Sequence, residues 1–496
     1  MSQILVEYST SGFNVIIPRA VEDLNIPPAK QTWPAEAFPL AICALLLPMG
    51  RLSDMYGGFP FYVAGLVWLT MTAVAAGFAR NELMLNLCRV SQGIGAASFL
   101  PAGLMLIGSI YRPGPRKNIV FAIYGACAPL GFFLGILSAG LSQEYVNWKL
   151  YFWIGGGISA STAVVAWFTI PSDIKERKGM GVRMDWIGFF TIPITVILIV
   201  FAITESAHAK KGWLSPHVLG TLAVGIGSTI ITTFYEGWIA TNPLIPPSVF
   251  KVKYMKALML SLLLEWGALS IYMYYGTFYM TKAMGASSIQ IVSWFLPMVV
   301  GGAIIALVSG KILDRISGTI LLIIASVTFI VAPLLFAIAP PGANYWAFTF
   351  PAMICATIGV DTSFTVSNVF ISNSVPLKEQ GIANAINSAL VHLGTALFIG
   401  CAEVVAISQR KHGEIWSFKA ALWFGFAVAV VSLIITLAFV RIKAATSDLT
   451  VEEKMTYEST TELVDHDLPV HDPYAKLDFR ILSLNALSDG KRNGMA

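Results

Sequence analysis

The chain has 496 residues, of which 56% are hydrophobic and only 12% are charged, and its formal net charge is +4. Soluble domains carry about 25% charged residues, so this composition excludes an ordinary soluble protein and indicates a polytopic membrane protein. The small net charge gives no basis for nucleic-acid binding. The five cysteines lie apart within apolar stretches, without the spacing of metal ligands, so we expect no disulfide framework, no metal site and no cofactor.

A membrane-spanning helix needs about 20 mostly apolar residues, and the sequence contains fourteen stretches of this kind. They group along the chain as six, two and six. We therefore predict an all-α membrane protein with an N-terminal six-helix bundle in 1–170, a linker with two additional transmembrane helices in 171–255, and a C-terminal six-helix bundle in 256–443. The predicted spans are 1–18, 35–55, 59–79, 83–110, 119–141, 150–170, 186–205, 217–239, 257–280, 292–310, 318–338, 345–371, 382–407 and 418–440.

Lysine and arginine gather in the loops on one side of these spans, which places both termini in the cytoplasm by the positive-inside rule. Residues 444–496 are polar, acidic in their first part and free of helical or strand periodicity, so we predict a disordered cytoplasmic tail. The first span begins at Met1 itself. Two explanations stay open: the chain has no N-terminal tail, or its start is assigned too late.

The turn between the second and third spans carries Gly50, Asp54 and Gly57. Glycines let two helix ends approach and turn sharply. An aspartate here can cap a helix N-terminus and favour one helix packing, which stabilises it by about 0.3–1 kcal/mol. The matching turn of the second half carries Asp314 and Arg315, an echo that indicates internal duplication. We predict that both turns form a conformational switch; an ordinary capped turn is the alternative.

Arg89 lies inside the fourth apolar span. A guanidinium stays charged in proteins, and an uncompensated arginine at the centre of a spanning helix costs about 2.5–3.5 kcal/mol on insertion scales. We therefore expect Arg89 to face the interior of a bundle or a water-filled cavity, and to have a function.

Together these motifs resemble the major facilitator superfamily, and specifically its fourteen-span drug:proton antiporter branch in fungal form. The resemblance covers about residues 1–443. The turn signature G-x-L-x-D-x-x-G and the fourth-span signature R-x-x-Q-G-x-G-A-A are both complete, whereas the fifth-span motif matches only in part, at positions that we expect to pack helices closely. The matching residues are Gly50, Leu52, Asp54, Gly57, Arg89, Gln92, Gly93, Gly95, Ala96, Ala97, Pro129, Gly131 and Gly135.

The resemblance implies that Arg89 takes part in proton coupling. The family's first-span aspartate falls on Ser9 in this chain, so the proton carrier must be another ionisable group. Glu7, two residues earlier, is one candidate. Asp361 and Glu265 lie mid-span and are further candidates, as are His392 and Glu403 in the thirteenth span, because ionisable groups within membrane spans mark proton pathways. Pairing or exposure at a helix end is the alternative for each.

Polar and aromatic side chains on the same spans are candidates for the substrate cavity, since organic ligands bind in apolar hollows that carry a few polar groups. For the aromatic side chains, helix packing or an interfacial belt is an equally good interpretation. The candidates are Gln92, Tyr272, Tyr275, Asn14 and His392.

The resemblance implies a secondary transporter, two six-helix bundles about a central cavity with two extra helices alongside. We predict proton-coupled efflux of a small organic molecule (a drug, toxin or secondary metabolite) by alternating access. We expect a monomer in the lipid bilayer of the plasma membrane, or of the vacuole. The alternatives are transport of a small polar solute (borate-like or amino-acid-like), uptake instead of export, and a non-transporting sensor. An enzyme is disfavoured because the six histidines are scattered.

Overall fold

This computed structural model describes residues 1–27, 30–110, 115–174, 183–313, 315–375 and 377–443. Thirteen helices in these ranges are long and apolar enough to cross a membrane. A further long helix, α1 (Ser2–Asp23), carries Glu7 within its apolar run and three charged residues near its end. Helices suit this sequence because a chain in lipid must satisfy every backbone polar group internally. The predicted all-α membrane fold is confirmed.

The first helix group packs around α1 and α4. A Cβ atom at Gly131 would lie 2.5 Å from Ile4 O, and one at Gly135 would lie 2.6 Å from Tyr8 O. These two glycines therefore let α5 approach α1 closely, as small residues do in membrane helices. The group comprises α1 (Ser2–Asp23), α2 (Trp33–Tyr56), α3 (Gly58–Gly77), α4 (Glu82–Ile110), α5 (Pro115–Tyr145) and α6 (Leu150–Thr169).

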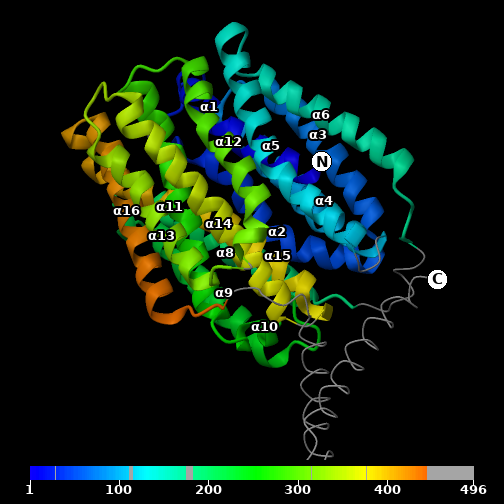
Figure 1. The fold of residues 1–496 in the computed structure, drawn as a ribbon. Helices are drawn as coiled ribbons and strands as arrows, with labels where there is room; N and C mark the ends of the chain where they lie inside the picture. The colour runs from blue at the N-terminus through cyan, green and yellow to red at the C-terminus, as the bar shows by residue number, and fades with distance from the viewer. Residues whose placement is uncertain (28–29, 111–114, 175–182, 314, 376, 444–496) are drawn as a thin grey trace, which may run out of the picture.

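The second helix group packs around α11, which contacts α13, α15 and α16. In Figure 1 it forms the green to orange half of the molecule, beside the blue and cyan first group. It comprises α11 (Met255–Lys282), α12 (Ser288–Leu313), α13 (Gly318–Ile338), α14 (Phe350–Ser374), α15 (Leu377–Gln409) and α16 (Glu414–Phe439).

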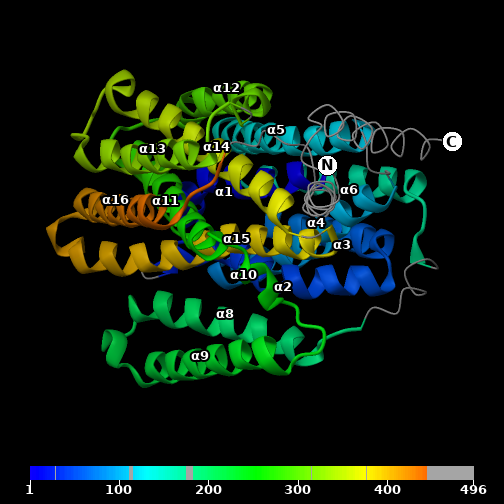
Figure 2. The ribbon, with the colours of Figure 1, turned by 60° about the horizontal axis from the view of Figure 1, so that its bottom comes forward.

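An inserted pair lies between the two groups in sequence and beside them in space. It consists of α8 (Trp186–Ser206) and α9 (Pro216–Phe234), followed by the π-helical turn η3 (Tyr235–Ile239) and the short α10 (Pro247–Lys251). Figure 2 shows α8 and α9 side by side along one edge, with α8 next to α2 and α15. The outer face of α9 exposes apolar side chains such as Ile230 and Ile231, as a lipid-facing helix does.

The helices run between two ends of the molecule. We call the end with the α1–α2, α3–α4 and α8–α9 connections the Asn25 end, and the opposite end, with the α2–α3 turn, the Gly57 end. The two helix groups meet along two seams, α2 against α15 and α5 against α12. The inserted α8 covers the first seam, because it packs against both α2 and α15.

The apolar core differs between the two ends. One continuous cluster joins the groups toward the Asn25 end; it includes Phe13 and Ile136 of the first group and Tyr272, Phe278 and Phe295 of the second. Toward the Gly57 end the core divides into a cluster mainly of first-group residues and others mainly of second-group residues. The groups are thus packed together more completely at the Asn25 end.

Helix bounds differ from the predicted spans mainly at charged ends. The first helix continues past Pro18 to Asp23, and α15 runs from Leu377 to Gln409, beyond the expected 382–407. Polar residues can extend a helix past the hydrocarbon layer, so hydropathy marks the span and not the helix. The predicted tail in 444–496 lies outside the described residues.

Candidate functional site

Arg89 lies inside the first helix group, only 2% exposed. Its guanidinium donates hydrogen bonds to Pro34 O (3.2 Å), Ser9 O (3.1 Å) and Gln92 Oε1 (3.1 Å). Its guanidinium carbon also lies 4.0 Å from the ring centroid of Phe13. Hydrogen bonds from a charged donor contribute about 1.5–3 kcal/mol each, so these contacts together can offset the cost of the buried charge.

Backbone and amide oxygens, and not a carboxylate, surround this cation. In the described part of the chain no acidic side chain forms an ion pair with Arg89. Ser9, at the position where the family has aspartate, offers its carbonyl oxygen to the guanidinium, while its hydroxyl donates to Leu5 O. A small cavity lies beside the group, between α1, α4 and α6, and Tyr151 is part of its wall. Arg89 is therefore a fixed positive charge within a partly polar interior.

Two carboxyl groups of opposite helix groups, Glu7 and Asp361, lie within electrostatic range of each other. Glu7 of α1 accepts a hydrogen bond from Gln3 Nε2 (3.2 Å), and Tyr124 OH of α5 donates to Gln3 Oε1 (3.3 Å). Asp361 of α14 lies close enough to act electrostatically on Glu7. Both carboxyl residues are only partly buried.

The place of Asp361 follows from the α5–α12 seam. A Cβ atom on Gly302 of α12 would lie 3.1 Å from Asp361 Oδ2 and 3.6 Å from the Cβ of Pro129 in α5. Pro129 is two residues before Gly131, which touches Ile4 of α1. Packing at this seam therefore places Asp361 toward the face of α1 that bears Glu7. The two helix groups each contribute one acid to the same region.

Glu265 lies elsewhere, in the interior of the second group. It is fully buried, and its Oε1 accepts hydrogen bonds from Ser326 of α13 (2.6 Å) and Ser432 of α16 (3.2 Å). Ser261 and Thr436 extend the same network of hydroxyl groups. Its hydrogen bonds join α11 to α13 and α16 and do not include Glu7 or Asp361, while its other oxygen, Oε2, is buried without a hydrogen-bond donor in the described part of the chain.

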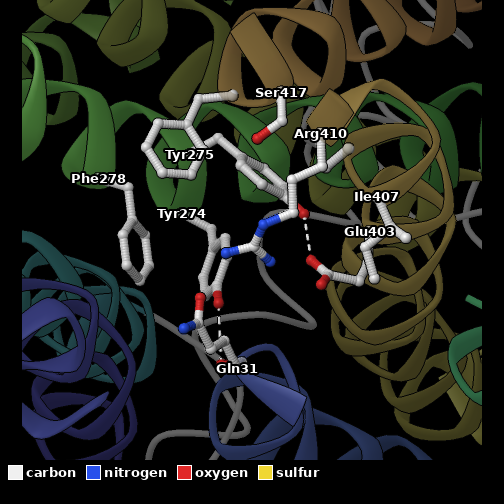
Figure 3. A pocket seen from close by; sticks show the side chains of 10 residues that line it. Gln31, Tyr274, Tyr275, Phe278, Glu403, Ile407, Arg410 and Ser417 are labelled. Atoms are coloured by element: carbon white, nitrogen blue, oxygen red, sulfur yellow. Dashed lines mark hydrogen bonds between the residues drawn. The ribbon is translucent and has the colours of Figure 1, made fainter. Parts of the chain in front are cut away.

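A small hollow, partly open to solvent, lies at the Asn25 end (Figure 3). Tyr274 OH donates to Gln31 O of the α1–α2 connection (2.9 Å), and Tyr275 OH donates to Glu403 Oε2 of α15 (2.6 Å). The guanidinium of Arg410 projects into the hollow between these groups. Tyr274 therefore joins the two helix groups at this end, whereas the contact between Tyr275 and Glu403 lies within the second group.

Further contacts join the two groups at the Asn25 end. Lys282 of α11 pairs with Glu22 of α1. Glu36 of α2 is fully buried and accepts a hydrogen bond from Thr204 of α8 (2.9 Å), which ties the inserted pair to the α2–α15 seam. His208 supplies no charge here at neutral pH, because burial, with nearby Lys30 as a smaller cause, lowers its pKa to about 4. Sequence patterns pointed to neither Glu36 nor its partner.

The predicted switch turn lies at the Gly57 end. Gly57 has φ +107°, a conformation that only glycine adopts readily, and the Cβ of another residue would lie 2.9 Å from Asp173 Oδ1. Asp173 follows α6 and is 8% exposed. Its carboxylate accepts hydrogen bonds from Gly58 N (2.8 Å) and Phe59 N (3.1 Å), so it caps the N-terminus of α3. The predicted Asp54 lies half-buried in the last turn of α2.

The connection between α6 and α8 also contacts this turn through Arg51, whose Nε donates to Arg183 O (3.2 Å). A Cβ atom on Gly50 would lie 3.4 Å from the Cβ of Pro101 in α4, which is an ordinary contact distance. In the second half Arg315 is exposed, and Asp314 lies outside the described residues. The first turn is thus bound to the segment that leads into the inserted pair.

Removing the Asp173 carboxylate is expected to weaken this turn. Asp173→Ala leaves two N–H groups of α3 without their acceptor, and loss of an N-terminal cap costs about 0.5–2 kcal/mol. We expect a lower melting temperature of the purified protein in detergent, and a smaller drop for Asp173→Asn, which keeps one acceptor oxygen. Equal melting temperatures for Asp173→Ala and wild type would contradict the assignment of the cap.

The predicted cavity residues lie on four helices, α1, α4, α11 and α15. Gln92 is bound to Arg89, and Tyr275 lines the hollow at the Asn25 end. Tyr272 is buried inside the second group, where its OH donates to the Sδ of Met353 (3.2 Å). The remaining two candidates, on α1 and α15, are half-buried; they are Asn14 and His392.

Known proteins resemble this chain along most of its length. A family model described as Major Facilitator Superfamily matches residues 1–399. Efflux pump terJ of Aspergillus terreus is 28% identical over 422 residues, which are 83% of this chain and 80% of that protein. The low affinity ammonium transporter of Saccharomyces cerevisiae is 28% identical over 418 residues, which are 82% of this chain and 80% of that protein.

Solved structures share the fold. A POT family transporter in complex with 5-aminolevulinic acid superposes with a TM-score of 0.62 at 14% sequence identity, covering 89% of this chain and 95% of that chain. The nucleoside transporter NupG superposes with a TM-score of 0.57 at 14% identity, covering 88% of this chain and 97% of that chain. The helical architecture, the family match over 1–399 and the transporter relatives agree: the chain belongs to the Major Facilitator Superfamily and is a membrane transporter, not an enzyme.

Proposed function

We propose that this protein exports a small organic molecule in exchange for protons by alternating access. In this mechanism the two helix groups, within 1–170 and 256–443, rock about the α2–α15 and α5–α12 seams and open the two ends in turn. We place both termini in the cytoplasm and the protein in the plasma membrane. The Gly57 end is then cytoplasmic, and the Asn25 end is exterior.

The acids Glu7 and Asp361 carry the proposal. Each comes from a different helix group, both are partly accessible, and Asp361 lies close enough to act electrostatically on Glu7. Two acids that share a region and an apolar surrounding can exchange protons with a substrate that enters between them. Because they lie on opposite groups, binding of a proton or a substrate there acts on the relative position of the groups.

Arg89 supports the same mechanism from within the first group. It holds α1 through Ser9 O and α2 through Pro34 O, so it fixes the helix that carries Glu7. We therefore propose that Arg89 takes part in proton coupling by positioning α1, the helix that carries Glu7.

Fungal efflux relatives favour export, and terJ is one of them. A second candidate function is transport of a small cation. The ammonium transporter of Saccharomyces cerevisiae is equally similar in identity, and two nearby acids suit a positively charged solute. Proteoliposomes separate the two candidates: accumulation of methylammonium without accumulation of larger organic dyes would favour the small cation.

Neutralising either Glu7 or Asp361 is expected to uncouple transport. In proteoliposomes, Glu7→Gln and Asp361→Asn should keep exchange of labelled for unlabelled substrate but lose accumulation driven by a pH gradient. One pH unit supports about tenfold accumulation for one exchanged proton, so the loss is about tenfold. Glu265→Gln is the matched control, because its acid is buried away from the seam, and it should keep coupling. Gradient-driven accumulation by both seam variants at the wild-type level would contradict the proposal.

A further inference from the structure

Two acids lie at the Gly57 end of the inserted pair, and both are distant in sequence from Glu7 and Asp361. Asp185 is the N-cap of α8 and is 6% exposed, and Glu236 lies in η3, at the end of α9, and is 5% exposed. Asp185 ends the connection from the first helix group, and Glu236 begins the connection to the second. The two acids thus join the two segments that tie the inserted pair to the rest of the molecule.

Each acid has one oxygen that is fully engaged. Asp185 Oδ1 accepts hydrogen bonds from Gly188 N (3.0 Å) and from Tyr235 OH (3.0 Å). Glu236 Oε2 accepts one from Ile245 N (3.0 Å), in the segment that leads to α10. The other two oxygens, Asp185 Oδ2 and Glu236 Oε1, are buried and have no hydrogen-bond donor in the described part of the chain.

The two unpartnered oxygens face the same point. A Cβ atom on Gly188 would overlap Glu236 Oε1 and would lie 2.7 Å from Asp185 Oδ2. Glycine at position 188 therefore makes room for the carboxyl group of Glu236 beside that of Asp185. Two ionised carboxylates that border the same buried space repel each other. One proton shared between them instead gives both oxygens a hydrogen-bond partner.

We propose that Asp185 and Glu236 bind one shared proton, which staples the base of α8 to η3 and so holds together the two connections of the inserted pair. The proton resides on Glu236 Oε1 and is donated to Asp185 Oδ2, because Asp185 caps the N-terminus of α8, where negative charge is stabilised. Loss of the proton leaves two negative charges side by side and weakens the contact between the start of α8 and η3. This inference is independent of proton coupling in transport.

The surroundings favour a proton over a metal ion. The groups that face the pair are donors: the Tyr235 hydroxyl and the backbone N–H groups of Gly188, Leu244 and Ile245. A bound cation instead needs oxygen ligands. Arg183, two residues before Asp185, is exposed, and no ion pair within the described ranges joins it to either acid.

A pH series of melting temperatures tests the shared proton in the full-length protein in detergent. The proton is bound in the folded state, so its stabilisation is present at low pH and is lost as pH rises. We expect Glu236→Gln, whose amide can donate to Asp185 without titrating, to lose less stability than wild type between pH 5 and pH 8, by about 2–4 °C. Glu144→Gln, at an exposed position near the end of α5, is the control and should follow wild type. Identical pH profiles for Glu236→Gln and wild type would overturn the proposal.

A second pair of variants tests the geometry and does not depend on titration. Gly188→Ala should lower the melting temperature by about 2–4 °C, because its methyl group overlaps Glu236 Oε1. The same change should cost less in a Glu236→Ala background, where only the contact with Asp185 Oδ2 remains. Equal costs in both backgrounds would overturn the proposed contact. A rise of several degrees on adding Ca²⁺ or Mg²⁺ to wild type, absent in Glu236→Ala, would assign the site to a metal ion instead.

Discussion

Replacing Arg89 by alanine is expected to abolish substrate accumulation driven by a pH gradient. The change removes three hydrogen bonds from a charged donor. The oxygens Ser9 O, Pro34 O and Gln92 Oε1 then lose their guanidinium donor. Loss of one such bond at a step that limits turnover costs about 1.5–3 kcal/mol, or about tenfold to a hundredfold in rate. Arg89→Lys should fall between alanine and wild type, because an ammonium keeps the charge but not the planar fork that reaches three acceptors.

The measurement is substrate accumulation in proteoliposomes at a fixed pH gradient, normalised to the amount of folded protein from size-exclusion chromatography. Arg80→Ala is a suitable control, since Arg80 is exposed in the α3–α4 connection and should transport like wild type. Accumulation at the wild-type rate by correctly folded Arg89→Ala would contradict this prediction, because the buried charge would then have no part in transport.

Cross-linking the Asn25 end is expected to stop transport completely. An ideal Cβ atom at Gly140 of α5 lies 3.5 Å from the Cβ of Val292 in α12, which is within the range that a disulfide spans. Replacing both residues by cysteine also removes the Val292 methyl group that would overlap this Cβ. Alternating access requires the two helix groups to separate at this end, and a covalent bond across the seam prevents that separation.

The experiment uses a background in which the five native cysteines are replaced by serine or alanine. Oxidation should inactivate the Gly140→Cys/Val292→Cys variant and a reducing agent should restore it, whereas each single-cysteine variant should be insensitive. If the oxidised double variant carries the intended disulfide by mass spectrometry and still turns over, then separation of these helices is not part of the transport cycle.

Structural features that depend only on local sequence were predictable. Apolar runs of about 20 residues mark spans because lipid leaves the backbone no other partner, and most helices follow those runs. The interior position of Arg89 also follows from one residue, since its charge excludes contact with lipid tails. The close approach of α5 to α1 follows from small residues spaced four apart, Gly131 and Gly135.

Contacts between distant segments were not predictable. Asp173 caps α3 across more than a hundred residues, and the sequence around the turn pointed to Asp54. Asp185 and Glu236 meet because α8 and α9 form an antiparallel pair, a geometry that spacing alone does not give. Glu265 shows the converse: an acid within a span indicates a functional group, but three-dimensional packing places it among the hydroxyl groups of Ser326 and Ser432.

The two acids of the proposed transport site were predicted as individuals but not as a pair. Glu7 and Asp361 each stood out as a charge in an apolar span, whereas their common region depends on the α5–α12 seam, where Gly302 brings Asp361 beside Pro129. Hydropathy contains no information about which faces of two helices meet. The proposed mechanism depends on the proximity of Glu7 and Asp361 at this seam.

Simultaneous measurement of substrate and proton fluxes tests proton-coupled exchange most directly. Wild-type protein in lightly buffered proteoliposomes, with a pH-sensitive dye inside, is given labelled methylammonium in one series and a fluorescent organic cation in another. We expect that substrate leaving in one direction moves protons in the other, and that a protonophore collapses the accumulation. Sustained substrate flux without any proton movement, and unchanged by the protonophore, would contradict proton-coupled exchange.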